Sequence, residues 1–228
     1  IIEPILNFVL GPDTQNSSKI ANEDSQAFEF DDTNIFDLNR YAGTDRITGG
    51  SRIDYGIRTS IAKDDGQQSE LLLAQSYRFA GSSSFGEASG LEHEKSDYIG
   101  RFTFFPNDAF NINYRFRLDR ENFSPNRVEL GLNLFHPQHT MGLDYILIDE
   151  QSETEEFGNR EQLDLNINSQ LLENWTSSLQ LVQDFKDNSN RTIKASLGVT
   201  YTDECFTIGI QYQREDMSGE DLQPEDQV

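Results

Sequence analysis

The sequence lacks the features that mark several common classes of protein. It has one cysteine, Cys205, so no disulfide can form within its 228 residues. Lysine and arginine total 18 against 40 aspartates and glutamates, a net charge of −22 at pH 7 that repels nucleic acid. No run of roughly 18 or more apolar residues occurs. We therefore expect no nucleic-acid partner and no transmembrane helix.

Patterns that carry catalysis or hold metals are also missing. The histidines His93, His136 and His139 do not have the spacing of metal ligands. No nucleophile-elbow, zinc-protease, phosphate-loop or EF-hand motif occurs. The glutamates between 150 and 156 are typical of a solvated loop. We expect no enzymatic activity, no cofactor and no metal site.

The two ends of the sequence look cut. The chain begins with Ile1-Ile2-Glu3-Pro4-Ile5, which already has the character of a strand, and shows no basic region or cleavage site of a signal peptide. It stops abruptly at Asp226-Gln227-Val228. We expect residues 1–228 to be one part of a longer protein. Cys205 would then be either a free thiol or half of a bridge to a segment outside the chain.

The dominant pattern is alternation of apolar and polar residues with a period of two, which is typical of strands. Sixteen phenylalanines and eight tyrosines supply apolar surface to bury and argue against disorder. No ten-residue amphipathic helix pattern separates the alternating segments, so consecutive antiparallel hairpins are favoured. We predict about eleven strands, near residues 1–10, 52–61, 69–79, 97–105, 110–119, 128–134, 141–149, 163–167, 175–181, 193–201 and 206–212.

Two features favour a transmembrane barrel over a soluble sheet. The polar positions carry Arg, Asn, Ser, Gln, Gly and Asp, which suit a wet lumen. The connections are mostly short and long in turn, as in outer-membrane barrels, with residues 187–190 as an exception. An open sheet of eleven strands would leave two unpaired edges in lipid. We therefore predict an all-β, antiparallel, up-and-down transmembrane β-barrel that is partial.

Residues 22–50 are too acidic for a strand and too aromatic for a solvated linker, so we expect a compact loop folded over its own apolar residues. This stretch strongly resembles the LPS-assembly outer-membrane protein family, LptD. The resemblance rests on a signature of Asn22, Glu23, Asp24, Ser25, Asn34, Asn39, Arg40, Gly43, Asp45 and Arg46.

The resemblance implies a function and partners. The chain would be the C-terminal part of a larger barrel in the outer membrane of a Gram-negative cell, with residues 11–48 as a long extracellular loop. With an LptE-type lipoprotein plug, the barrel would receive lipopolysaccharide (LPS) from a periplasmic bridge through a missing N-terminal domain and insert it among the lipids of the outer leaflet. In this family, cysteines at the late periplasmic turn bridge to the periplasmic domain. Only Cys205 matches here, where the family often has two.

Six basic residues share the polar-face parity of their strands: Arg52, Arg58, Arg101, Arg115, Arg117 and Lys194. They would guide an anionic glycolipid or contact a plug protein. The alternative is that they pair with Asp54, Asp97 and Asp119 in salt-bridge ladders. For the whole chain, two other functions stay open: a different outer-membrane channel or receptor, and a soluble secreted β-sandwich adhesin.

Overall fold

The computed structural model describes residues 1–13, 16, 23–25, 29–64, 67–86, 88–149, 160–185 and 190–216. These residues form one antiparallel sheet in which each strand pairs with its neighbours in the sequence. The predicted all-β, up-and-down architecture with eleven strands is confirmed. The strands are β1 (Ile2–Val9), β2 (Ser51–Ala62), β3 (Gln68–Ala80), β4 (Tyr98–Asn107), β5 (Phe110–Leu118), β6 (Pro125–His136), β7 (His139–Ile148), β8 (Arg160–Leu172), β9 (Trp175–Asp184), β10 (Arg191–Thr202) and β11 (Thr207–Glu215).

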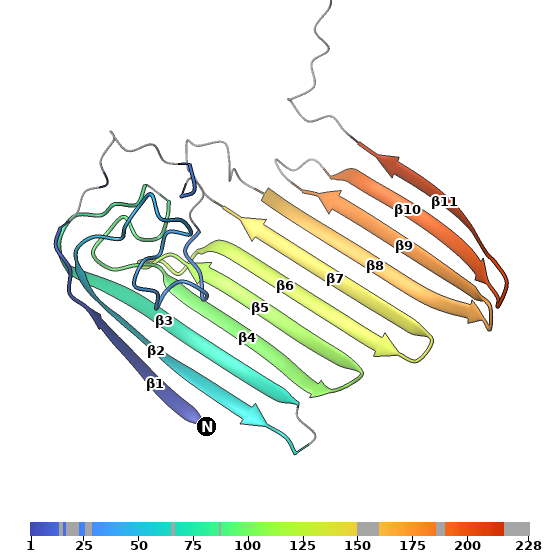
Figure 1. Ribbon diagram of the computed structural model, residues 1–228, viewed down its shortest axis with the longest axis horizontal. Helices are drawn as coiled ribbons and strands as arrows, with labels where there is room; N and C mark the ends of the chain where they lie inside the picture. The colour runs from blue at the N-terminus through green and yellow to red at the C-terminus, as the bar shows by residue number, and fades with distance from the viewer. Residues whose placement is uncertain are drawn as a thin grey trace, which may run out of the picture.

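The sheet is a single curved layer, as Figure 1 shows, and β1 and β11 are its two edges. It is open, because these two strands do not pair with each other, and it has the form of a segment of a barrel wall. No helix in the described part of the chain is long and apolar enough to cross a membrane.

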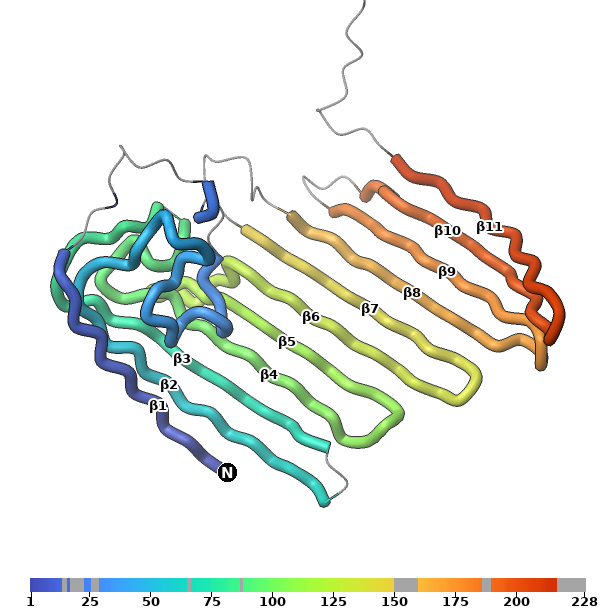
Figure 2. The backbone as a smooth tube through the Cα atoms, viewed as in Figure 1, coloured from blue at the N-terminus to red at the C-terminus, as the bar shows by residue number. Residues whose placement is uncertain are grey.

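Short connections lie at one end of the strands and long connections lie at the other. Figure 2 shows the turns that follow β4, β6, β8 and β10 at one end of the sheet, and the long segments gathered at the other. At the turn end, β6 and β7 are joined by Pro137 and Gln138 alone, and His136 pairs with His139. At the other end lie the connections 10–50, 81–97 and 119–124. The expected acidic loop at 150–159 and the connection at 187–189 lie outside the described residues.

Several predicted strands are too short, the most marked being 163–167, which is the middle of β8 (Arg160–Leu172), and the end of β4 is also misplaced. The predicted strand ends at residue 105, which leaves Pro106 and Asn107 outside it, but β4 runs through Asn107 and the turn consists of Asp108 and Ala109. The pairing register with β5 shifts between Phe104 and Asn107. Proline has no N–H to donate to the ladder, so such an irregularity accommodates Pro106 inside the strand.

In a soluble sheet the apolar face is buried and the polar face is exposed, and in this sheet the reverse holds. The apolar face carries pairs such as Leu6 opposite Tyr55 and Ile57 opposite Leu73. Its side chains are open, with Leu6 64% and Ile210 79% exposed. The polar face is covered over β2–β5, where Asp54 has no exposed area at all. Because apolar area is stabilised by leaving water, this arrangement requires hydrocarbon on the apolar face.

No second sheet covers the apolar face within the described ranges. The two-layered sandwich that a soluble adhesin would need is therefore not the fold of these residues. Aromatic side chains instead cluster at both ends of the strands. Tyr201 lies between Trp175 and Phe206 at the turn end, with ring centroids 5.2 and 5.6 Å away, and Tyr98 stacks on Phe123 at the loop end. This placement is typical of the aromatic girdles of outer-membrane barrels.

Phe116 fills a gap in the apolar face. It pairs with Gly100 on β4, and its ring lies directly over that glycine. A Cβ at position 100 would lie 2.0 Å from the ring. Glycine is therefore required at this position for the ring to lie flat against the strand.

Candidate functional site

The main candidate site is a loop seated on the polar face, residues 29–49, which we call the capping loop. Phe30 and Ile35 are fully buried, and they pack against Ala74 of β3, Ile99 of β4 and Leu91. The loop therefore places a small apolar core on the polar face of the sheet. The expected apolar packing holds for these residues, but Leu38 is 73% exposed and Phe28 lies outside the described residues.

Asp54 on β2 is the centre of the first polar contact between the loop and the sheet. Its carboxylate accepts from Arg40 Nη2 of the loop at 2.5 Å and from Arg52 Nε at 3.2 Å. Ser76 Oγ donates to the same carboxylate at 2.6 Å, and Asn7 Nδ2 donates at 3.2 Å. One buried carboxylate thus ties together β1, β2, β3 and the capping loop.

The two arginines beside Asp54 also hold the backbone of the capping loop. Arg40 Nη2 donates to the carbonyl of Ile35 at 2.9 Å, and its guanidinium lies 5.2 Å from the centre of the Phe30 ring. Arg52 donates to the carbonyls of Asp37 and Leu38. Burial lowers the pKa of Arg40 to about 10, against the attraction of Asp54, and the nearby charge of Arg52 lowers it further.

Asp32 forms the second contact. Its two carboxylate oxygens accept from Arg101 of β4 at 2.7 Å and from Arg115 of β5 at 2.8 Å. Arg101 also pairs with Glu70 of β3 at 2.5 Å. A loop carboxylate thus bridges two arginines on adjacent strands, which is a charge-assisted contact with fixed geometry.

A third contact extends the loop's reach to β6. Glu29 pairs with Arg127, and Glu129 on the same strand pairs with both Arg127 and Arg115. The capping loop is therefore held by opposite charges along one line across the polar face, from β2 to β6.

The signature residues hold the loop in shape. Asp24 accepts from the backbone N–H groups of Thr44 and Asp45 at 2.8 and 3.0 Å. In return, Asp45 accepts from the N–H groups of Glu23 and Asp24 at 2.9 and 3.2 Å. The hydrogen bonds from the N–H groups of Thr44 and Asp45 lower the pKa of Asp24 well below its ordinary value. A Cβ at Gly43 would lie 2.1 Å from Asp24 Oδ1, so only glycine allows this approach.

Two asparagines of the signature close turns. Asn39 Oδ1 accepts from the N–H of Thr48, and its Nδ2 donates to the carbonyl of Arg46. Asn34 Oδ1 accepts from the N–H of Asp31. Ser25 donates to Asp24, and Asn22 lies outside the described residues. The side chains of Asp24, Asn34, Asn39 and Asp45 thus support the loop backbone, which explains why these positions are polar in a loop with a buried core.

The second segment over the polar face is residues 88–97. Arg117 of β5, 2% exposed, lies 3.6 Å from the carboxylate of Asp97 and donates to the carbonyls of Ala88 and Ser89. Asn126 Nδ2 donates to Asp97 at 2.8 Å. Burial raises the pKa of Asp97 in spite of these two favourable partners.

The remaining basic candidates lie away from the capping loop. Arg58 pairs with Glu3 at 3.4 Å and Lys194 pairs with Glu215 at 3.8 Å, both near open edges of the sheet. Asp119, which the sequence offered as a salt-bridge partner, instead accepts from the backbone N–H groups of Glu121 and Asn122. These hydrogen bonds lower its pKa.

Beyond the capping loop, the polar face carries an open groove of about 500 Å³ over β5–β10. Its lining includes Arg115, Glu129, Asp144 and Asp164. Farther toward the turn end, the polar face over β8–β10 carries uncharged side chains: Asn166, Asn168, Ser178, Gln180, Ser196 and Thr200. The polar face thus has a charged, covered part and an uncharged, open part.

The sequence profile of the family described as LPS transport system D, LptD, matches residues 1–175. The chain belongs to the LptD family. The resemblance read from the signature in residues 22–46 is therefore confirmed, and membership assigns the chain to LPS transport in the Gram-negative outer membrane. No curated protein matches the chain in sequence.

The LptD match ends before the late turn that holds Cys205. This cysteine is exposed and has no disulfide partner in the described chain. Its backbone N–H donates to Asp203 Oδ1 at 2.8 Å, as does that of Phe206, and these hydrogen bonds lower the pKa of Asp203. The turn therefore holds the thiol outward at the end of the sheet opposite the capping loop.

Sequence reasoning missed several residues of this LptD site. Asp32, Ser76, Glu29 and Arg127 were not among the candidates, although Asp32 bridges two residues that were. The signal that could have found them is charge. The stretch is acidic and has no strand pattern, and the arginines of the neighbouring strands all lie at positions that point to the same face of the sheet. His136 and His139 stack on each other at the far end of the sheet, 5.4 Å apart, and contact none of these residues.

Proposed function

We propose that residues 1–228 form the C-terminal part of the barrel of an LPS-assembly translocon, which inserts LPS into the outer leaflet of the outer membrane. The observation that supports this most directly is the inverted sheet, with apolar side chains open and charged ones covered, in a chain of the LptD family. Strands outside this chain would pair with β1 and β11, since unpaired edges are not tolerated in lipid.

The proposed partners are those that membership of the LptD family implies. An LptE-type lipoprotein would enter the lumen as a plug, and a periplasmic bridge would deliver LPS through an N-terminal domain. The capping loop and the rest of residues 11–48 would face the cell exterior, opposite the short turns. Four of the basic candidates, Arg52, Arg101, Arg115 and Arg117, would serve first to hold the loops, because carboxylates or backbone carbonyls of loops occupy their guanidinium groups.

Cys205 would bridge to the periplasmic domain, because it lies exposed at the turn end. Electrophoresis of the full-length protein with and without reductant tests this. A band that shifts on reduction in the wild type, but not in Cys205→Ser, is expected. Identical mobility of the wild type in both conditions would exclude a bridge.

The decisive experiment is conditional depletion of the full-length protein in its own cells. Newly made, radiolabelled LPS is then followed to the surface with an antibody added outside. Surface LPS should fall while total LPS is maintained, and a lipoprotein should co-purify with the solubilised barrel. If surface LPS were unchanged and uptake of small solutes fell instead, the chain would belong to a diffusion channel.

A further inference from the structure

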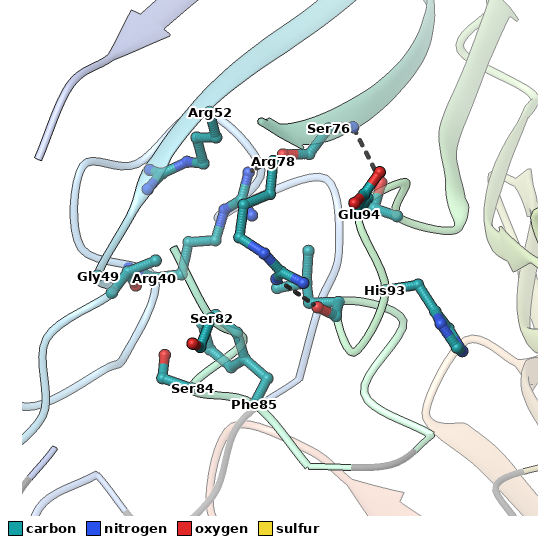
Figure 3. Close-up of a pocket in the computed structure, with 13 residues that line it drawn as sticks. Arg40, Gly49, Arg52, Ser76, Arg78, Ser82, Ser84, Phe85, His93 and Glu94 are labelled. Atoms are coloured by element: carbon teal, nitrogen blue, oxygen red, sulfur yellow. Dashed lines mark hydrogen bonds between the residues drawn. The ribbon is translucent and has the colours of Figure 1, made fainter. Parts of the chain in front are cut away.

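A small pocket, partly open to solvent, lies between the capping loop, β2, β3 and the segment 82–96. It measures about 20 Å³ and is lined by three arginines, Arg40, Arg52 and Arg78, with serine hydroxyls around them. Figure 3 shows these lining residues, with Arg40 from the loop, Arg52 from β2 and Arg78 from β3. A cavity needs about 10–15 Å³ to hold one water, so this one admits a single particle of that size.

The positive charge around the cavity exceeds the buried negative charge. Asp54 is the carboxylate that pairs with both Arg40 and Arg52, among the residues that the structure describes. Arg78 donates hydrogen bonds to the carbonyls of Leu91 and Glu92 at 3.1 and 3.4 Å, and the carboxylates of Glu94 and Asp13 attract its charge. Glu94 also lines the cavity but is exposed to solvent. Two buried guanidinium groups, those of Arg40 and Arg52, thus share one buried carboxylate, and the half-buried Arg78 lies beside them.

Two N–H donors beside the cavity have no acceptor. Arg40 is 4% exposed and Arg52 is 3% exposed, and both line the cavity. Arg40 Nε and Arg52 Nη1 are buried and have no hydrogen-bond partner in the described chain. A buried donor without an acceptor is costly, and more so when it carries charge. The pocket thus lies beside two buried arginines that share one carboxylate and that each keep one unpaired N–H donor.

We propose that this cavity is a binding site for a small monatomic anion, of which chloride is the abundant example. The anion would accept hydrogen bonds from Arg40 and Arg52, and it would neutralise the positive charge that Asp54 does not balance. The pocket has room for about one water-sized particle, so a monatomic anion fits it better than a phosphate or a carboxylate group. The bound anion would fix the capping loop to β2 and β3.

Bromide, which scatters anomalously, tests the site directly. Crystals of the full-length protein in its solubilised complex are soaked in sodium bromide. An anomalous peak between Arg40 and Arg52 is expected. A cavity that holds only water, with no bromide peak, would overturn the proposal.

Hydrogen exchange tests the consequence in solution. Amide exchange of residues 29–49 is compared in sodium chloride and in sodium gluconate, whose anion is too large, at equal ionic strength. At tenfold excess over the dissociation constant, chloride should slow exchange about tenfold. Equal exchange in the two salts would contradict the proposal.

Two variants separate the site from general salt effects. Arg78→Gln removes one of the three charges and should weaken the chloride effect severalfold. Arg58→Gln removes an arginine on the same face that lies outside the cavity, and it should leave the chloride effect unchanged. An equal response to chloride in Arg78→Gln and wild type would argue against the site. Should Arg78→Gln fail to assemble, the bromide measurement on the wild type still decides.

Discussion

Asp54→Asn is the sharpest perturbation of the contact between the capping loop and the sheet. The change keeps the shape of the side chain but removes its charge, so Arg40 and Arg52 lose their shared buried carboxylate. Removing one partner of a buried ion pair costs about 3–5 kcal/mol, because the other charge stays buried without compensation. Docking of the capping loop should weaken by that amount.

Hydrogen exchange of residues 29–49 in the solubilised full-length protein measures this cost. Since each 1.4 kcal/mol corresponds to a factor of about ten, Asp54→Asn should speed exchange of the loop at least roughly a hundredfold. Glu3→Gln is the matched control. It breaks an exposed pair with Arg58, which is worth about 0–1 kcal/mol. If the two variants exchanged at the same rate as wild type, the loop would not depend on Asp54.

Three further outcomes are expected. Gly43→Ala should free the segment around Asp24 and weaken the loop by about 1–3 kcal/mol in hydrogen exchange, whereas Gly86→Ala, where nothing lies within 4 Å, should change nothing; equal effects would refute the steric reading. Because folding lowers the pKa of Asp24, the ionised carboxylate stabilises the loop at any pH above the ordinary pKa of aspartate, and this stabilisation is lost as the pH falls through the folded-state pKa. Amide exchange of the loop should therefore accelerate in strong acid, and Asp24→Asn should abolish that pH dependence. Gly100→Ala should reduce the yield of heat-modifiable barrel on gels, and adding Phe116→Leu should restore it; no rescue would show that the ring is not the obstacle.

The sheet could be predicted from the sequence because its determinants are local. In residues 110–119 the alternation of Phe110, Ile112 and Tyr114 with polar residues fixes both the strand and its two faces, with no knowledge of the partner strands. The end of β4 at Pro106 was misread because it depends on the pairing register with the next strand, which no local pattern contains.

The capping contacts could not be predicted in the same way. Asp32 meets Arg101 and Arg115 across separations of 69 and 83 residues in the chain. Nothing near Asp32 distinguishes it from the neighbouring Asp31, because its role depends on the path of the loop across the sheet. The signature was recognisable as a pattern, but the mutual support of Asp24 and Asp45 appears only when the two turns are placed side by side.

The division of the polar face has a consequence for movement along it. The described loops occupy the wall from β2 to β6 through ion pairs, while over β8–β10 the open wall near the turn end offers amide and hydroxyl groups such as those of Asn168, Ser178 and Thr200. Neutral hydrogen bonds are individually weak and water replaces them readily. A hydrated sugar chain that moves along this half would form short-lived hydrogen bonds one after another, and no strong ionic contact would hold it in place.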